Sequence, residues 1–235
     1  MKVILTHEQA DMDALASQLG AWLLYPEALP LLPRNINRNG RRYLQEFGEK
    51  LPYIEFDDLP REPLEMVILV DTQSLITLKG MSEETKIVVY DHHPLREDLD
   101  PSWELHLVEA GSNASQMIAR IRDEGLELTT IQATTLALGL YEDTGSFTYG
   151  STTPADLQAA GFCIEQGANL DVVMRFLYPP LSDGQRKLYD RLLKNVETYP
   201  VEDQIILAAK ADAMDVSDEI SSVAHKMRDV LNPDA

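Results

Sequence analysis

The sequence predicts an α/β fold, with a mostly parallel open sheet flanked by helices, then a helical linker and a partial second α/β unit. Short apolar runs rich in β-branched residues recur through the first 150 residues, as expected of strands buried on both faces. Segments with helical spacing of apolar residues separate these runs, which is the pattern of βαβ units. Beyond residue 150 the pattern becomes helical and then opens a new strand–helix unit.

Five apolar runs are predicted as strands. The strongest cover residues 3–5, 66–70 and 87–90, and the weaker ones cover residues 29–32 and 105–108. Helices are expected between them, near residues 12–25, 35–47, 113–125 and 130–142. Asn35 and Ser112 are predicted N-caps, and Gly48 and Gly125 are predicted stops.

Three further helices are predicted for the segments TPADLQAAGFCIEQGA, NLDVVMRFLYP and DGQRKLYDRLLKNVETY. Pro154 suits the first position of the first one, and Asn169 suits the cap of the second. A strand at 205–208 and a helix near 217–231 follow. We therefore expect a first domain over residues 1–180, a linker helix over 181–199 and the start of an incomplete second domain over 200–235.

The composition is that of an acidic globular protein. Among 235 residues, 39 Asp and Glu outweigh 20 Lys and Arg, which gives a formal charge of −19. This charge argues against binding of duplex nucleic acid, whereas a small phosphorylated substrate stays compatible because bound divalent cations reverse the charge locally. No apolar run reaches about 18 residues, so no membrane span is predicted. The short apolar start and the single Cys163 predict a cytoplasmic protein.

Acidic and histidine residues follow the ends of the three strongest strands and of one helix. They are His7, Asp11 and Asp13, then Asp71, then Asp91, His92 and His93, and finally Asp143. The carboxyl ends of parallel strands lie along one edge of a sheet, so these side chains are expected to meet there. Carboxylates crowded at one edge raise one another's pKa unless a cation compensates.

Aspartate and histidine without cysteine favour manganese, magnesium or iron over structural zinc. A carboxylate such as Asp71 can bridge two ions, and a two-metal site stabilises both the attacking and the leaving oxygen of a displacement at phosphorus. The set therefore predicts a dinuclear site that cleaves phosphoesters. For any one of these acids taken alone, the alternative is a polar residue that merely begins the loop after a strand.

Four motifs in this order resemble the DHH phosphoesterase superfamily: His7-x3-Asp11-x-Asp13, Asp71 at a strand end, Asp91-His92-His93, and Asp143-Thr144-Gly145. That superfamily includes inorganic pyrophosphatases of the second family, single-strand exonucleases, and nano-RNA and cyclic-dinucleotide phosphodiesterases. The match covers about the first 150 residues. The HEQAD form of the first motif resembles the DHH segment of exopolyphosphatase- and nanoRNase-like proteins, above all those joined to CBS and tRNA-nucleotidyltransferase-like modules.

The resemblance implies two divalent metal ions, usually manganese, with magnesium as an alternative. The implied ligands are His7 and Asp11 on the first ion, Asp13, His92 and Asp143 on the second, and Asp71 between the two. It also implies that Asp71 and His93 act in catalysis, that His93 contacts the substrate phosphate, and that Asp91 orients a histidine ring.

Asn113 and Ser115 open a predicted helix, whose free N–H groups could receive a substrate phosphate. An ordinary helix cap is the alternative for these two residues.

Together these features predict a metal-dependent phosphoesterase that hydrolyses a phosphodiester, phosphomonoester or phosphoanhydride with metal-activated water. The expected substrate is a nucleotide, short RNA, pyrophosphate or polyphosphate, and a homodimer is left open. Family members usually carry a glycine-rich GGGH-type loop, yet no Gly-Gly-Gly-His occurs here. We therefore expect either a weakly active fragment or a chain without that substrate clamp.

The main alternative is a non-catalytic nucleotide- or metal-binding regulatory module of a larger protein, which the missing glycine-rich loop favours. A response-regulator-like domain with a phosphorylatable Asp71 is a third interpretation, and it leaves His92 and His93 unexplained.

Overall fold

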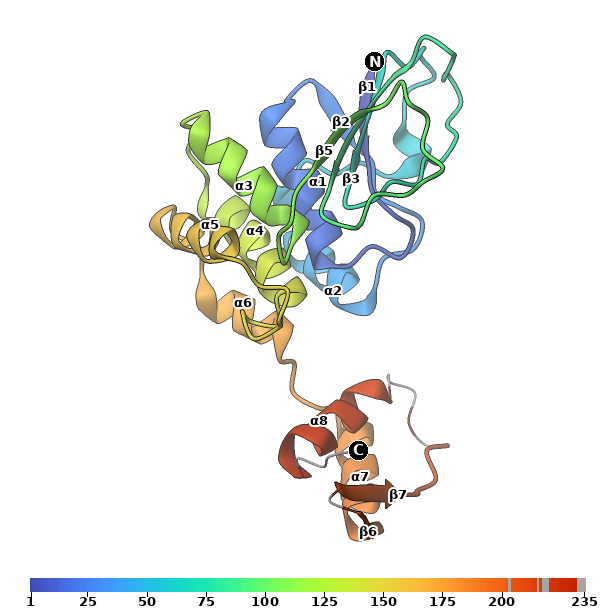
Figure 1. Cartoon of the computed structure of the whole chain (residues 1–235), viewed down its shortest axis with the longest axis vertical. Coiled ribbons are helices and arrows are strands. Elements are labelled where there is room, and N and C mark those ends of the chain that lie inside the picture. Colours follow the sequence, from blue (N-terminus) through green and yellow to red (C-terminus); the bar gives the residue numbers. More distant parts are fainter. Residues whose placement is uncertain (203, 215, 217–219, 232–235) are drawn as a thin grey trace. The chain divides into compact units, whose positions relative to one another are not determined.

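The computed structural model describes the chain except residues 203, 215, 217–219 and 232–235. It forms two compact units, Met1–Tyr178 and Pro179–Ala235. The first unit contains a five-stranded sheet in the order β2-β1-β3-β4-β5, and every neighbouring pair of strands is parallel (Figure 1). The predicted α/β class, with a parallel open sheet flanked by helices, is confirmed.

All five predicted strands are present, with small shifts at their ends. They are β1 (Lys2–Leu5), β2 (Ala28–Pro30), β3 (Met66–Val70), β4 (Lys86–Asp91) and β5 (Glu104–Leu107). The register places Leu5 opposite Leu69 and Val70 opposite Tyr90. Strands β1, β3 and β4 therefore end at the same edge of the sheet, and the residues that follow them start from one place.

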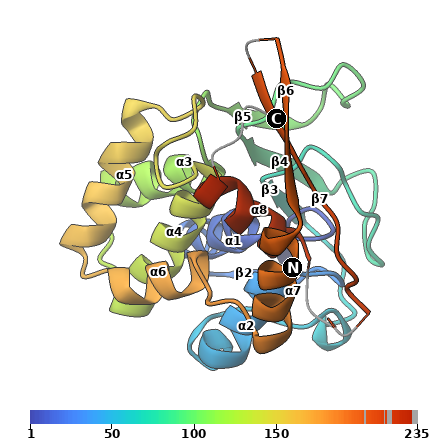
Figure 2. The same cartoon turned by 90° about the horizontal axis from the view of Figure 1, so that it is seen from below.

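The helices of the first unit lie mainly on one side of the sheet (Figure 2). They are α1 (Met12–Leu24), α2 (Arg38–Phe47), α3 (Asn113–Asp123), α4 (Thr130–Asp143), α5 (Pro154–Glu165) and α6 (Leu170–Leu177), with short 3-10 turns η1 (Gly48–Lys50) and η2 (Phe56–Asp58). Ala21 of α1 and Met117 of α3 pack against Ile68 and Val88 of the sheet. The opposite face carries Val67 and its neighbours, which are covered by apolar residues of loops and of the short turn η2. This asymmetry brings the starts of α1 and α3 to the edge where the strands end.

Most helix starts agree with the sequence signals, and one differs. Ser112 caps α3 and Asn169 caps α6, as predicted. Helix α2 is capped by Asn37, whose side chain accepts from the Gly40 N–H at 2.7 Å, and not by Asn35. The Asn35 carbonyl instead accepts from the Ala10 N–H at 3.1 Å, beside the bridge that pairs Ala10 with Ile36, so the helix starts after this bridge.

The second unit is built from α7 (Asp183–Lys194), the antiparallel pair β6 (Val196–Val201) and β7 (Gln204–Ala209), and α8 (Ser221–Leu231). The helix predicted to run to Tyr199 ends at Lys194, because β-branched Val196 and Thr198 pair with β7. The predicted strand at 205–208 lies within β7, and the predicted start of the last helix at 217–219 falls outside the described residues. Within the described part of the chain, no helix is long and apolar enough to cross a membrane.

Gly139 sets the close crossing of α4 over α1, and its replacement tests this contact. An added Cβ would lie 2.5 Å from Ala16 Cβ and 2.7 Å from the Met12 carbonyl oxygen. We expect Gly139→Ala to destabilise the unit by about 1–3 kcal/mol through overpacking. Gly161→Ala, on the exposed side of α5 with no atom within 4 Å of the new Cβ, should instead stabilise by roughly 0.5–1 kcal/mol. Urea unfolding of both variants checks this, and equal stabilities would refute the tight crossing.

Candidate metal centre

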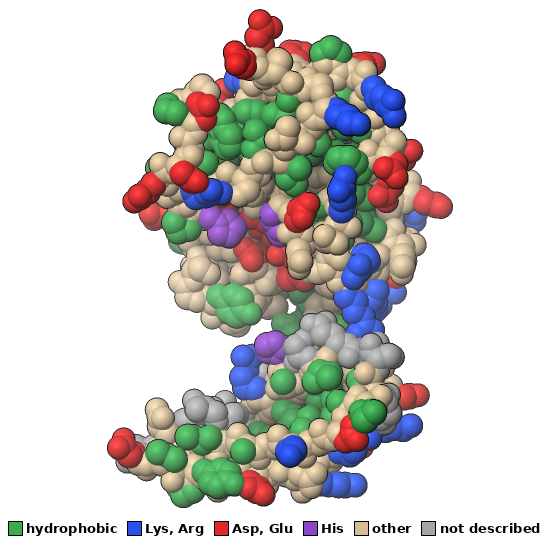
Figure 3. Space-filling view, turned by 90° about the vertical axis from the view of Figure 1, so that its right-hand side faces the viewer, with side chains coloured by type: hydrophobic (Ala, Val, Ile, Leu, Met, Phe, Trp, Pro, Cys, Tyr) green, Lys and Arg blue, Asp and Glu red, His purple; other side chains and the backbone are tan. Residues whose placement is uncertain are grey.

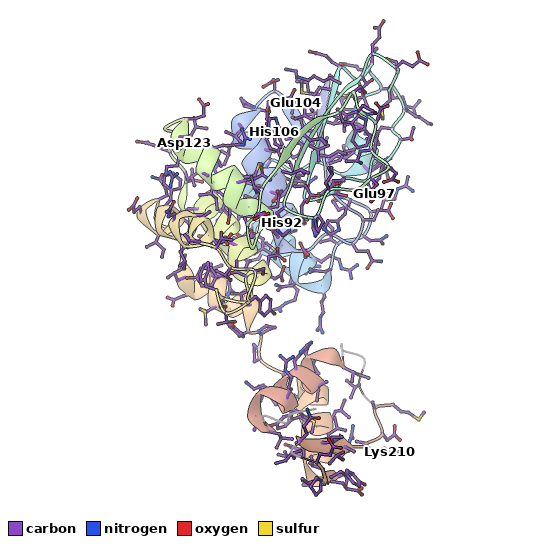
Figure 4. All side chains as sticks on the ribbon, in the orientation of Figure 1. His92, Glu97, Glu104, His106, Asp123 and Lys210 are labelled. Carbon is purple, nitrogen blue, oxygen red and sulfur yellow. The ribbon has the colours of Figure 1, made fainter. Side chains whose placement is uncertain are left out.

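Eight predicted residues come together at the ends of β1, β3 and β4, the start of α1 and the end of α4. They are His7, Asp11, Asp13, Asp71, Asp91, His92, His93 and Asp143. All but Asp13 line a cleft of about 390 Å³, and Asp13 is 1% exposed. Figure 4 labels His92, which lies where the sheet edge faces the helices. Figure 3 shows histidines among acidic side chains on one face of the first unit.

Asp71 is the central residue of this group. It directly follows β3 with a φ of +56°, a left-handed conformation that aspartate tolerates better than most residues. Its Oδ2 lies 3.3 Å from His7 Nε2, and its Oδ1 lies 3.4 Å from His92 Nε2. Oδ1 is buried and has no hydrogen-bond partner in the described part of the chain. A buried acceptor without a partner is costly, and a bound cation would satisfy it.

His7 and His92 present the same nitrogen to the carboxylates. His7 Nδ1 donates to the Glu8 carbonyl at 2.9 Å, and His92 Nδ1 donates to the Ala110 carbonyl at 3.0 Å. A carbonyl oxygen only accepts, so Nδ1 carries a proton in each ring, and in the neutral ring Nε2 is the unprotonated nitrogen that faces the acids. This second contact of the ring is the arrangement that orients histidine ligands in metal sites.

The electrostatics of the group show how strongly these side chains interact without a metal. The hydrogen bond with Asp71 raises the pKa of His7 to about 9. Burial lowers the pKa of His92, but Asp71 and Asp13 outweigh it and raise that pKa to about 10. Burial alone would raise the pKa of Asp71, yet the two histidines hold it below its ordinary value. Burial raises the pKa of Asp143 to about 6.

The ligand atoms fall into overlapping groups whose members lie within 4.8 Å of one another. One group contains His7, Asp11 and Asp71, and another contains Asp13, His92 and Asp143. Because Asp71 Oδ1 also lies near His92 Nε2, this carboxylate faces both groups. The donors are oxygen and imidazole nitrogen without thiolate, a set that suits manganese, magnesium or iron. The residues present therefore fit two divalent cations.

Asp13 is tied to the start of α3. Its carboxylate accepts from Ser112 Oγ at 2.6 Å, from the Asn113 N–H at 2.8 Å and from the Ala114 N–H at 3.0 Å. Burial, followed by the charges of neighbouring aspartates, raises the pKa of Asp13 well above its ordinary value. The positive end of α3 thus binds an acidic side chain of the protein.

Asn113 and Ser115, which were predicted to contact a substrate phosphate, are not among the residues that line the cleft, and this contact stays a prediction. Both side chains are buried. The Asn113 side chain bonds Ser17 at 2.9 Å, and Ser115 Oγ donates to Asp156. The N–H groups that could have received a phosphate already donate to Asp13.

The family comparison agrees with this geometry. A model described as "DHH family, N-terminal domain" matches residues 2–140. The chain belongs to the DHH family.

The similar proteins show the range of this family. An A-adding tRNA nucleotidyltransferase of Geobacter sulfurreducens is 34% identical over all of this chain, which spans 27% of that protein. The cyclic-di-AMP phosphodiesterase GdpP of Geobacillus thermodenitrificans is 24% identical over 93% of this chain and 35% of its own length. An exopolyphosphatase-related protein of Bacteroides fragilis has the same fold, with a TM-score of 0.60 at 22% identity over 84% of this chain and 62% of that one.

The DHH triplet itself divides into parts with different surroundings. The His93 side chain is 57% exposed, and its Nδ1 lies 2.8 Å from Asp91 Oδ1. Asp91 is 1% exposed and also accepts from the His92 N–H and from Gln73 Nε2 at 2.8 Å. Gln73, which sequence reasoning missed, follows Asp71 closely but carries no motif signal.

Members of the DHH family are metal-dependent phosphoesterases, which supports the predicted reaction class at that level.

Glu142, next to Asp143 in the fourth motif, points elsewhere. Its Oε2 accepts from the Met12 N–H at 2.7 Å, and its Oε1 accepts from Asn39 Nδ2 at 3.1 Å. It therefore anchors the start of α1, the helix that carries Asp13, and leaves Asp143 to face His92.

Proposed function

We propose that this chain hydrolyses a phosphodiester, phosphomonoester or phosphoanhydride bond at a dinuclear site, with Mn²⁺ as the first choice of metal and Mg²⁺ as the second. The observation that carries the proposal is Asp71, a buried carboxylate between His7 and His92 with one oxygen unsatisfied. Two cations bound there would lower the pKa of a water molecule and neutralise charge on the phosphoryl oxygens.

We assign a separate role to each residue of the site, either in metal binding or in substrate binding. His7 and Asp11 would hold one cation, and Asp13, His92 and Asp143 the other, with Asp71 shared. His93 is the exposed member of the triplet, so it would donate a hydrogen bond from Nε2 to the substrate phosphate. Asp91 accepts from Nδ1 and raises the pKa of His93, which favours the doubly protonated ring, and only that form donates from Nε2.

The substrate class follows from the size and character of the cleft. A volume of about 390 Å³ fits a small phosphorylated molecule such as a nucleotide, a dinucleotide or pyrophosphate.

A cytoplasmic location stays a prediction from the sequence.

Hydrolysis of bis-p-nitrophenyl phosphate, with and without Mn²⁺, tests the proposed reaction. We expect turnover that depends on the metal and disappears with a chelator, together with bound Mn²⁺ in metal analysis. Thermal stabilisation by nucleotides without any turnover would favour the non-catalytic binding module instead.

The Asp91–His93 pair gives a separate prediction. Asp91 raises the pKa of His93, so Asp91→Asn should lower that pKa and weaken donation to the phosphate. We expect kcat to fall about 10- to 100-fold, and the basic limb of the pH–rate profile to move to lower pH. Asp123→Asn, an exposed acid on α3, is the control. An unchanged pH profile in Asp91→Asn would contradict this role.

A further inference from the structure

Arg96 is the single arginine or lysine among the residues that line the cleft in the described structure. It follows the DHH triplet closely, in the loop after β4. The other charged groups lining the cleft are aspartates and histidines. An anionic substrate must enter between these acids, so a permanent cation at this place is the natural partner for its charge.

The guanidinium of Arg96 is held in one orientation from two sides. Its Nε and Nη2 donate to Asp98 at 3.0 and 2.8 Å, and its Nη1 donates to Ser74 Oγ at 2.6 Å. These contacts take three of the five N–H donors of the group. Among the described residues nothing else occupies the other two donors of this planar group, whose geometry matches phosphate oxygens.

The backbone of Arg96 is fixed to the same network as the metal centre. Its N–H donates to Gln73 Oε1 at 2.9 Å. The Nε2 of Gln73 donates to Asp91 at 2.8 Å and to the Pro94 carbonyl at 3.2 Å. Gln73 is buried, so it ties the loop that carries His93 and Arg96 to the end of β3. The guanidinium is therefore positioned relative to the triplet before any substrate arrives.

Stability alone does not account for this arrangement. The side chains of Arg96 and Asp98 are 45% and 69% exposed. Exposed ion pairs of this kind contribute little to folding. The three contacts instead hold the guanidinium in a fixed orientation at the cleft, which favours the binding of an anionic ligand there.

We propose that Arg96 forms a subsite for a second phosphate group of the substrate. The substrate then carries two phosphates, one at the metal centre and one at the guanidinium, as in a 5′-phosphorylated dinucleotide. This inference rests on the proposed function and narrows its substrate class.

The test compares two ligands that differ by one phosphate, pApA and ApA, on the full chain with Mn²⁺. Binding is measured by isothermal titration calorimetry and hydrolysis by chromatography. We expect the wild type to bind pApA at least about tenfold tighter than ApA. Arg96→Ala should bring this ratio close to one, and Arg96→Lys, which keeps the charge but lacks the fork, should give an intermediate ratio. Arg122→Ala, at an exposed arginine beside Asp123 on α3, should keep the full ratio.

The outcomes separate the subsite from the proposed reaction. Equal affinities in the wild type, a ratio retained in Arg96→Ala, or no binding of either ligand would each overturn the subsite. A ratio that depends on Arg96 without hydrolysis would support the subsite and remove the hydrolytic function. Hydrolysis with no such ratio would leave the function standing and remove the subsite. If Arg96→Ala fails to fold, Arg96→Lys decides by the same ratio.

Discussion

Replacement of Asp71 by asparagine is expected to abolish tight binding of divalent cations and to lower metal-dependent hydrolysis by about 100-fold or more. The carboxylate faces both His7 and His92, and its Oδ1 is buried without a partner in the described structure. Asparagine offers one neutral oxygen and an NH₂ group that cannot act as a metal ligand. The two proposed cation positions would therefore lose their shared ligand together.

The fold should survive this change, which makes the result interpretable. Asp71 has a φ of +56°, and asparagine is among the residues that adopt this conformation readily. At 100 times its dissociation constant, a cation stabilises the native state by about 2.7 kcal/mol. For a unit of this size that corresponds to a rise of about 5–10 °C in unfolding temperature.

Thermal unfolding with increasing Mn²⁺ measures the effect of Asp71→Asn directly. The wild type should show the rise, and Asp71→Asn should show almost none. Glu97→Gln, an exposed acid in the loop after the triplet, removes the same formal charge and should keep the rise. If Asp71→Asn kept both the Mn²⁺ shift and the activity, a bridging role for this carboxylate would be excluded.

The sheet could be predicted because its strands are buried on both faces. Runs such as Met66–Val70 are apolar throughout, and a parallel topology then brings the residues after each strand to one edge. That rule alone led from separate motifs to a common cleft for His7, Asp71 and His92. The sequence did not reveal β6, because the helical pattern of α7 continues into Val196–Val201 and only pairing with β7 decides its state.

The supporting contacts of the site were out of reach for a different reason. Gln73 donates to Asp91 and accepts from the backbone N–H of Arg96. The residues next to Gln73 in the sequence form no motif that predicts these partners. At the start of α3 we predicted a negatively charged group, a substrate phosphate, and the N–H groups there do bind an acidic group. The anion is Asp13, brought from α1 by the packing of the helices. Long-range side-chain pairing of this kind leaves no periodic signal in the sequence.

Mn²⁺ binding is expected to tighten steeply as pH rises from about 7 to about 9. In the metal-free chain the pKa of His7 is raised to about 9 and that of His92 to about 10, so both rings are protonated at neutral pH. A histidine must be neutral to bind a metal, so each ring has to release its proton. The apparent dissociation constant should fall by up to about 100-fold per pH unit, because up to two protons leave.

The stability of the metal-free chain should change in the opposite direction. A histidine whose folded pKa lies above its unfolded value of about 6.5 stabilises the native state fully below that pH. This contribution is lost as pH rises through the folded values of about 9 and about 10. Between those limits, unfolding temperatures with a chelator should fall while the added stabilisation by Mn²⁺ should grow.

Calorimetry in two buffers with different ionisation enthalpies counts the protons released at each pH. His92→Gln should reduce the release by about one proton, because one raised pKa is removed. His106→Gln is the matched control, since His106 lies on β5, pairs with Glu104 and does not line the cleft (Figure 4). Proton release near zero at pH 7 in the wild type would show that these rings are not the ligands. The opposite pH trends with and without metal thus test the ligand set independently of any substrate.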